Sequence, residues 1–373
     1  MLAIPWRATS DAVLHWRWLI SAGRVYAARR NRSALLVQSH RAQFYERVWR
    51  DAARVLGAQP HTVGRGILQI THGNRHTRVL NNETAADDLV TLRLVNDKTT
   101  VHGILRAHGL PVPTHVEFTL GSLEPAQRFL AGARASCVVK AARSTGAGEG
   151  ITTGIRTRSQ LRKAALHAAV YAKELLIEEE VVGSVYRLLF ADGRLIDTVL
   201  RRCPTVVGDG RSTVRKLVMQ ENVRRVRQGE AAAQALLHVD LDMRQTLARK
   251  GLSLTSIPGV GIEVDVKTVT NDNASRDNEP ANAVLSEAVI QAGRQAVSIL
   301  GMRLAGVDVI TADPTQPLHA TGGVILEVNG NPGYHYHYYR RGAGAAVAVP
   351  ILAMLLGLDS ETAVPAAPRA TEG

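Results

Sequence analysis

Three side chains near the end of the chain have the types and spacing of a magnesium site. Glu327 and Asn329 lie two residues apart in the apolar run VILEVNG, so both point to the same face of a predicted strand. Asp308 lies in the preceding apolar run, LAGVDVI, and reaches that face if the two runs pair as antiparallel strands. Carboxylate and amide oxygens are hard ligands that suit Mg²⁺, and phosphate oxygens can complete its shell. The alternative is that Glu327 is a solvent-facing strand residue and Asn329 forms a turn.

A glycine-rich segment upstream has the properties of a phosphate site. Lys140 lies in the apolar run SCVVKAA, and RSTGAGEGITTG follows it directly. Glycines let backbone N–H groups approach phosphate closely, and a serine adds a hydroxyl donor. The spacing matches neither a Walker A motif nor a Rossmann fingerprint, so a flexible connector is the alternative. The residues concerned are Lys140, Ser144, Gly146, Gly148 and Gly150.

Two more segments could contact a nucleotide. Lys98, in VNDKTT, precedes a predicted amphipathic helix. Only seven of the 45 basic residues are lysines, so a lysine is less often placed in a motif by chance. Glu178, in the predicted strand LLIEEEVV, could accept a hydrogen bond from an adenine amino group. Glu179 and Val181 could offer backbone groups to the ring. The alternatives are a surface lysine and a polar strand end.

Composition narrows the class of protein. A hydrophobic content of 45% and a charged content of 21% over 373 residues predict a globular chain of two or three lobes. Arginine supplies most of the net charge of +12, which indicates a compositional bias more than a nucleic-acid partner. No apolar run approaches the roughly 20 residues of a membrane span, and charges interrupt the N-terminal apolar patch, so we expect neither a membrane segment nor a signal peptide. Two cysteines, Cys137 and Cys203, cannot form a disulfide framework, which predicts a reduced, cytoplasmic protein.

Local patterns predict an α+β order of elements around these residues. Residues 1–95 hold an Arg-rich helical stretch over 25–54 and a hairpin that turns at THGN. Residues 359–373 form a tail rich in Ala, Pro, Thr and Glu that is predicted to fray. The elements predicted between them are a helix over 96–109, a strand over 136–142, a helix over 159–173, a strand over 174–182, a hairpin over 186–202, helices over 212–227 and 281–301, and two final strands.

The order and spacing of these segments resemble the ATP-grasp superfamily, and in particular the ATP-grasp regions of cyanophycin synthetase and bifunctional glutathione synthetase. The resemblance runs from about residue 67 to residue 338. Its most specific passages are NDKTTVHGILRAHGLPVP, CVVKAARSTGAGEG, LLIEEEVVGSVYRLL, RRCPTVVGDGRSTVRKLV, TLARKGLSLTSIP and LAGVDVITADP with GGVILEVNGNPG.

The resemblance implies an ATP-grasp fold, in which two α+β lobes clasp ATP. Residues 96–178 would form the small lobe and 179–358 the catalytic lobe, preceded by an N-terminal α/β region over 1–95. The implied activity is ATP-dependent ligation of a carboxylate to an amine through an acyl phosphate, with release of ADP and phosphate. The implied cofactors are ATP and one or two Mg²⁺, for which Mn²⁺ can substitute. The substrates would be an amino acid, a peptide or a specialised metabolite.

The resemblance also implies roles for particular residues. Lys98 and Lys140 match the paired nucleotide lysines, and residues 143–150 match the mobile loop over the phosphates. Residues 178–181 resemble the adenine-binding hinge. The remaining matches are the metal-binding trio of Asp308, Glu327 and Asn329, the basic residues Arg187, Arg201 and Arg202 around the site, and Asn273 near the transferred phosphate.

The chain departs from the family pattern in three places. Gly183-Ser184-Val185 lacks the acidic residue expected after the hinge glycine, which puts ribose recognition there in doubt. Arg276 and Asp277 replace glycines expected after NDNAS, so we expect a reshaped acceptor side. The sequence holds no Mur-ligase-like second region, so a complete arginine-adding cyanophycin polymerase is not expected.

The run YHYHYY over residues 334–339 has three interpretations. It could form an aromatic and imidazole wall around the acyl acceptor, bind a transition metal, or pack in the interior. As a wall it would contribute Tyr334, His335 and His337, beside Arg201, and one of the two histidines could assist deprotonation of the amine.

Two other classes of function compete with the ligase. A nucleotide-binding regulator or scaffold would keep the fold without turnover. A nucleic-acid-binding protein would need a recognisable module, which we do not find. A homo-oligomer is compatible with all of these hypotheses.

Overall fold

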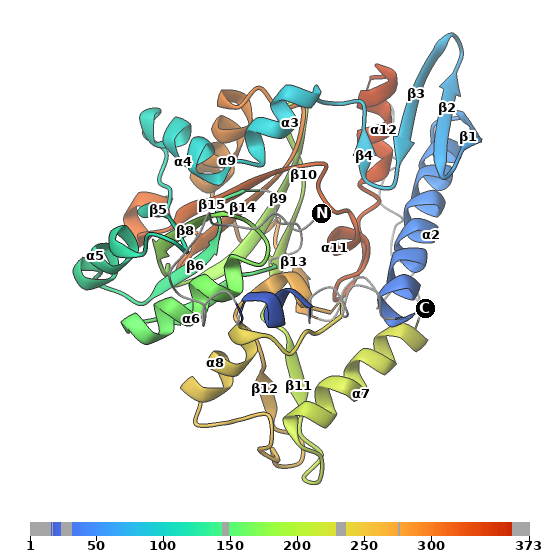
Figure 1. The fold of residues 1–373 in the computed structure, drawn as a ribbon. Helices are drawn as coiled ribbons and strands as arrows, with labels where there is room; N and C mark the ends of the chain where they lie inside the picture. Colours follow the sequence, from blue (N-terminus) through green and yellow to red (C-terminus); the bar gives the residue numbers. More distant parts are fainter. Residues whose placement is uncertain are drawn as a thin grey trace.

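The structure is a computed structural model that describes residues 16, 18–23, 32–143, 149–228, 236–274 and 277–359 (Figure 1). Its largest element is a five-stranded antiparallel sheet in the order β13-β10-β9-β14-β15. The hairpin predicted over 186–202 is confirmed, because β9 and β10 pair as antiparallel strands. Asp192 and Gly193 at its turn both have positive φ, at 45° and 72°. The strands are β9 (Ser184–Ala191), β10 (Arg194–Arg201), β13 (Asn278–Pro280), β14 (Leu304–Thr311) and β15 (Val324–Gly330).

One face of this sheet packs on helices that precede its first strand and on one helix, α9, that lies between β13 and β14 in sequence. Helices α4 and α9 bury their apolar sides against Leu188, Phe190 and Val307, among other strand residues. The opposite face carries the polar side chains described below. The helices are α3 (Leu89–Val95), α4 (Lys98–Ala107) and α9 (Glu287–Ile299), so the helix predicted over 96–109 begins at Lys98, after an N-cap at Asp97.

A second antiparallel sheet, in the order β5-β8-β6-β7, forms the small lobe. Helices α5 and α6 share an apolar core with it, and a capping box at Thr157 begins α6. The strands predicted over 136–142 and 174–182 are confirmed as β6 and β8, and the structure shows that they pair directly. The elements are β5 (His115–Thr119), α5 (Glu124–Gly132), β6 (Cys137–Ala141), β7 (Thr152–Ile155), α6 (Arg158–Ala168) and β8 (Glu174–Glu179).

A small subdomain with a core of its own follows the central hairpin and lies at the bottom of Figure 1. The helix predicted over 212–227 is confirmed as α7, which Thr213 caps. The elements are β11 (Thr205–Val207), α7 (Val214–Arg227), α8 (Leu241–Arg249), β12 (Glu263–Asp265) and the 3₁₀ helix η2 (Thr270–Asp272).

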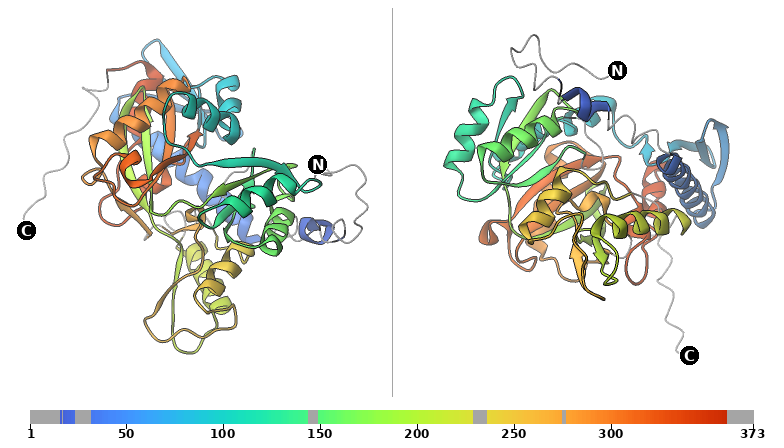
Figure 2. Two further views of the ribbon diagram at one scale, coloured as in Figure 1. Left: turned by 90° about the vertical axis from the view of Figure 1, so that its left-hand side faces the viewer. Right: turned by 60° about the horizontal axis from the view of Figure 1, so that its bottom comes forward.

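Helix α2 and the strands β1 to β4 pack against the large sheet. Figures 1 and 2 place them on the side of the molecule away from the small lobe. Trp18 and Ala22 lie elsewhere, in the apolar core of the small lobe. Helices α2 and α12 lie against each other, and their core continues to Leu189 on β9 and Leu304 on β14. The hairpin predicted at THGN is confirmed as β2 and β3. The elements are α2 (Arg32–Val55), β1 (Gln59–Gly64), β2 (Ile67–His72), β3 (Arg75–Leu80), β4 (Glu83–Thr84), α11 (His335–Tyr338) and α12 (Ala348–Leu356). Helix α10 (Leu318–Thr321) lies between β14 and β15 in sequence and packs with α4 and α9 in the core of the large sheet.

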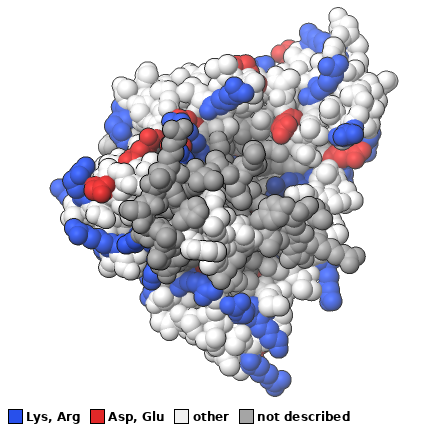
Figure 3. Space-filling view, viewed as in Figure 1, with Lys and Arg blue, Asp and Glu red and all other residues white. Residues whose placement is uncertain are grey.

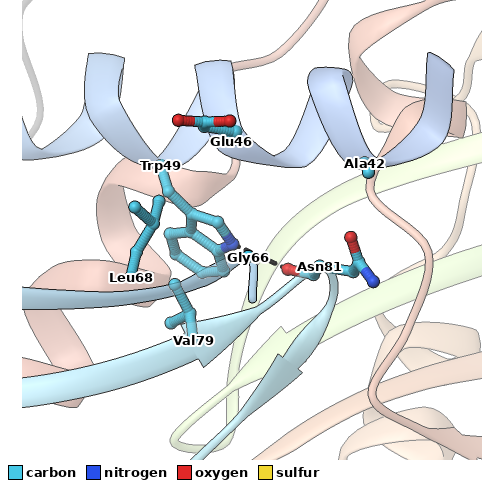
Figure 4. Close-up of a pocket in the computed structure, with 7 residues that line it drawn as sticks. All are labelled: Ala42, Glu46, Trp49, Gly66, Leu68, Val79 and Asn81. Atoms are coloured by element: carbon cyan, nitrogen blue, oxygen red, sulfur yellow. Dashed lines mark hydrogen bonds between the residues drawn. The ribbon is translucent and has the colours of Figure 1, made fainter. Parts of the chain in front are cut away.

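A cavity of about 50 Å³ lies between α2 and the N-terminal sheet (Figure 4). The Trp49 indole lies across it and donates a hydrogen bond of 2.7 Å to the carbonyl of Asn81. Its lining is mostly apolar or already hydrogen-bonded, so the cavity belongs to the packing of α2. None of the described helices is long and apolar enough to cross a membrane.

Candidate active site

The predicted trio of oxygen ligands lies on one face of the large sheet. Asp308 and Glu327 are directly paired across β14 and β15, as the sequence predicts for antiparallel neighbours. Asn329 lies two residues beyond Glu327 and therefore shares its face. Its side-chain nitrogen is 3.5 Å from Oδ2 of Asp308. The sheet alone therefore brings the three side chains together.

Cationic side chains surround this trio. Lys98, in the first turn of α4, places Nζ 2.8 Å from Oε1 of Glu327. Arg187 on β9 donates to both oxygens of Asp308, and Arg201 on β10 lies 3.7 Å from the same carboxylate. The arginines occupy neighbouring strands because β9 and β10 pair directly. The face thus alternates acidic and basic groups.

The protonation of Glu327 follows from these neighbours. Burial acts to raise its pKa, but the positive charges of Lys98, Lys140 and Arg187 and the hydrogen bond from Lys98 lower the pKa to about 2. Glu327 is therefore a carboxylate at neutral pH, as a metal ligand must be.

Lys140 and Glu178 form a buried pair in the small lobe. Their side chains are each 4% exposed, and Nζ of Lys140 lies 2.7 Å from Oε1 of Glu178. The other carboxylate oxygen, Oε2, is buried and has no hydrogen-bond partner within the described residues. A buried acceptor of this kind is rarely left unused, so the atom suits the amino group predicted for this position.

The start of the glycine-rich loop is tied to Lys98. The backbone N–H of Lys98 donates to the carbonyl of Ala142, and Arg143 forms an ion pair of 2.9 Å with Asp97. Of the predicted loop residues, Ser144, Gly146 and Gly148 lie outside the described residues. Gly150 has a φ of 77°, and a Cβ there would lie 2.7 Å from Tyr171, so this position requires glycine.

The predicted hinge residues beyond Glu178 differ in what they offer. The N–H of Glu179 already donates to the carbonyl of Thr114, and its carboxylate accepts from the N–H of Arg134. Of its backbone groups, only the carbonyl of Glu179 could therefore bond to an adenine ring. Val181 follows the end of β8, where the chain passes from the small lobe to the large sheet.

The predicted basic residues separate into two groups. Arg187 and Arg201 are buried, and their guanidinium carbons lie 5.7 and 4.2 Å from the ring centre of Tyr336. The Arg202 side chain is 54% exposed and pairs with Glu279, so it does not join this cluster. Asn273 is buried nearby, where its side-chain nitrogen donates to Asn278, the partner of Arg201 across β10 and β13.

The residues of the aromatic run after β15 also differ in their surroundings. Tyr334 is fully buried among Tyr45 and Trp49 of α2, so its side chain packs in the interior. His335 contacts Tyr336, with ring centres 3.9 Å apart. His337 is buried beside Asp197. No group of three potential His, Cys, Asp or Glu ligands occurs within the part of the chain that the structure describes, so the transition-metal interpretation gains no support.

Sequence reasoning missed two residues of this site. Tyr336 was grouped with its neighbours but lies against both buried arginines. Asp197 was not identified, although a lone carboxylate inside the apolar run RLIDTVL is a signal that could have revealed it.

Comparison with known proteins supports this architecture. No family model matches the chain. It is 30% identical over 274 residues to cyanophycin synthetase from Trichormus variabilis (strain ATCC 29413 / PCC 7937), covering 72% of this chain and 30% of the relative. It is 29% identical over 273 residues to the glutathione biosynthesis bifunctional protein GshAB from Pasteurella multocida (strain Pm70), covering 71% of this chain and 36% of that protein. The resemblance predicted from the sequence is confirmed.

A solved structure shows the fold. A bifunctional glutathione synthetase from Pasteurella multocida superposes with a TM-score of 0.52 and 24% sequence identity, covering 82% of this chain and 43% of that one. The chain has the ATP-grasp fold. The predicted α+β class is therefore confirmed. The chain spans only about a third of the length of the curated relatives it matches.

Proposed function

We propose that the chain is an ATP-dependent carboxylate–amine ligase that forms an amide or peptide bond and releases ADP and phosphate. The observation that carries the proposal is the convergence of Lys98, Asp308, Glu327 and Asn329 on one face, with the charge of Lys140 acting on Glu327. Such a set suits an anionic nucleotide with its metal. The similarity to cyanophycin synthetases and bifunctional glutathione synthetases supports the same conclusion.

The residues present fit MgATP. Asp308, Glu327 and Asn329 would hold one or two Mg²⁺, or Mn²⁺ in their place, because all three offer hard oxygen donors. When bound, the metal would neutralise phosphate charge and favour phosphoryl transfer. Lys98 and Lys140 would contact the phosphates, and the unused oxygen of Glu178 would accept from the adenine amino group.

Side chains of the protein would offset the negative charge of the substrate carboxylate. A substrate carboxylate must approach an anionic triphosphate, and buried Arg187 and Arg201 can offset that repulsion. Preorganised charges of this kind require no reorganisation when charge develops in the transition state. Asn273 lies beside Arg201 and would face the same region.

The substrates follow from the class of reaction. We propose an amino acid, a peptide or a specialised metabolite as carboxylate and amine. A nucleic-acid partner is not part of the proposal. On the face shown in Figure 3, basic side chains lie at separate places, with acidic ones among those in its upper half.

The first test is a screen for ADP release over amino acids and short peptides, with mass spectrometry of the products. With a carboxylate and an amine that give ADP release, Glu327→Ala is expected to slow turnover at least about a hundredfold. Glu263→Ala, at an exposed position, serves as its control. Lys140→Ala is expected to behave similarly, beside exposed Lys163→Ala, and a thermal melt reports the loss of its buried pair separately. Wild-type turnover in Glu327→Ala would refute the site, and nucleotide binding without ADP release from any pair would favour a regulator.

A further inference from the structure

His337 is a buried imidazole with one nitrogen in use and one without a partner. It lies on α11 and is 0% exposed. Its Nδ1 is 2.7 Å from Oδ2 of Asp197, and since a carboxylate can only accept, Nδ1 carries the proton. Nε2 therefore holds a lone pair, and it has no hydrogen-bond partner among the residues that the structure describes. This is the tautomer that a proton acceptor requires.

Asp197 is itself held in place. Its Oδ1 accepts from the side-chain nitrogen of Asn282 at 2.9 Å, and its Oδ2 accepts from Arg340 at 2.7 Å. Burial acts to raise its pKa, but His337 and Arg340 together lower it, so the group is ionised. A fixed carboxylate on Nδ1 both orients an imidazole and stabilises the imidazolium form.

The pair lies on the face of the sheet that carries the candidate active site. Asp197 pairs with Leu189 across β10 and β9, and Val199, two residues on, pairs with Arg187. Residues two apart on a strand share a face, and Arg187 in turn pairs with Asp308. His337 therefore belongs to the same side of the sheet as the arginines and the oxygen trio.

The neighbouring His335 lacks these properties. It is surrounded by positive charge from Arg41, Arg187 and Arg201, and together with burial this holds its pKa well below the usual range. No carboxylate bonds to it among the described residues. A proton on His335 would have no counter-charge.

The charged groups that face His337 are Asp197, Arg340 and Arg187, with His335 alongside. Burial lowers the pKa of His337, and Asp197 partly offsets this while the two arginines add to it. The ring is therefore neutral at neutral pH.

We propose that His337 accepts a proton from the ammonium group of the amine substrate, and that Asp197 positions it for this step. The inference rests on the proposed ligase function. Nε2 takes one proton from R–NH₃⁺, which leaves R–NH₂ with a free electron pair. The nitrogen then attacks the acyl carbon, the C–O bond to phosphate breaks, and the second proton leaves with the phosphate as HPO₄²⁻. The products are the amide, hydrogen phosphate and a protonated His337.

Hydroxylamine separates proton removal from formation of the acyl phosphate. It is uncharged at neutral pH and traps acyl phosphates as hydroxamates without a base. The variant is His337→Asn, whose amide can still donate to Asp197 but has no atom in place of Nε2. The exposed His319→Asn is the matched control. Amide and hydroxamate are measured on the full chain with the same ATP and carboxylate.

We expect His337→Asn to lose about a hundredfold or more in amide formation and to keep hydroxamate formation close to wild type. Equal loss of both products, or loss of neither, would overturn the role of His337 while leaving the ligase intact. If the wild type forms neither product with any carboxylate, the ligase proposal itself fails, and the proposed role of His337 fails with it.

A second measurement does not depend on a substrate. In the ¹⁵N-histidine-labelled full chain, the His337 ring is assigned by its disappearance in His337→Asn. We expect a neutral Nδ1–H tautomer at neutral pH. A protonated ring, or a ring with its proton on Nε2, would contradict the proposal.

Discussion

Glu178 combines a neutralised charge with an unused acceptor. Oε1 is paired with Lys140, and Oε2 is buried without a described partner. A carboxylate in this state can accept one more hydrogen bond at little electrostatic cost, because its charge is already compensated. This is the arrangement expected for recognition of a neutral amino group on a base.

Replacing Glu178 by glutamine is expected to weaken nucleotide binding. Gln keeps the shape but loses the charge on both the Lys140 contact and the predicted adenine contact. Hydrogen bonds to charged groups contribute about 1.5–3 kcal/mol, so the Kd of MgADP should rise about tenfold or more. Isothermal titration calorimetry measures this directly.

The matched control for that change is Glu174→Gln, four residues earlier on β8. It carries the same change of charge at a position that the site does not use. An unchanged affinity in Glu178→Gln, or an equal loss in both variants, would remove Glu178 from the nucleotide site.

At the scale of elements, local signals predicted more than long-range ones. The hairpin of β9 and β10 follows from its Asp-Gly turn, and the pairing of Asp308 with Glu327 follows from two adjacent apolar runs. Both require only information from neighbouring parts of the sequence.

Contacts between distant segments could not be predicted in the same way. His337 and Asp197 are 140 residues apart, and the local sequence around either residue does not predict contact with the other. Arg201 and Arg202 show a different failure. Adjacent residues at the end of a strand point to opposite faces, so only one of them could join the site. Their opposite exposures follow this rule.

Lys267 joins two elements of the small subdomain. Its Nζ lies 2.7 Å from Asp240, the N-cap of α8, and 2.6 Å from Asp272 in η2. Burial acts to lower its pKa, but the two carboxylates raise it above the usual range. Burial acts to raise the pKa of Asp272, but Lys267, with help from His238, lowers it to about 2. The lysine therefore stabilises two acidic groups that are largely withdrawn from water.

Lys267→Met is expected to destabilise the fold by about 3–5 kcal/mol at neutral pH, because it removes the lysine that compensates the buried carboxylate of Asp272. The folded pKa of Asp272 lies below the unfolded value of about 3.9, so its stabilising contribution is present above that pH. It is lost as the pH falls through about 2. The difference between wild type and variant should therefore shrink over this acidic range. Urea unfolding at several pH values measures it, and a difference independent of pH would contradict the argument.

At the scale of the whole molecule, helix α2 is joined to the segment of chain that follows β15. The Tyr45 hydroxyl of α2 accepts a hydrogen bond of 3.1 Å from the N–H of Tyr334. The Tyr334 ring lies between Tyr45 and Trp49, with centres 5.6 and 5.5 Å apart. Helix α2 thus packs against the segment that leads from the oxygen trio to His337. This gives α2 a structural role in fixing the segment that follows β15.

Trp49→Ala tests whether the N-terminal unit, which is α2 with strands β1 to β4, and the large sheet unfold together. Trp49 is 1% exposed, so its truncation should cost about 3–5 kcal/mol. Because the same core reaches β9 and β14, unfolding should remain a single transition at lower urea, and amide formation should fall through displacement of residues 334–337. Trp49→Phe keeps a ring against Tyr334 but loses part of the buried ring system and the hydrogen bond to Asn81, so it should cost less than Trp49→Ala. Two separate transitions, with the one near the site unchanged from wild type, would show instead that the N-terminal unit folds independently.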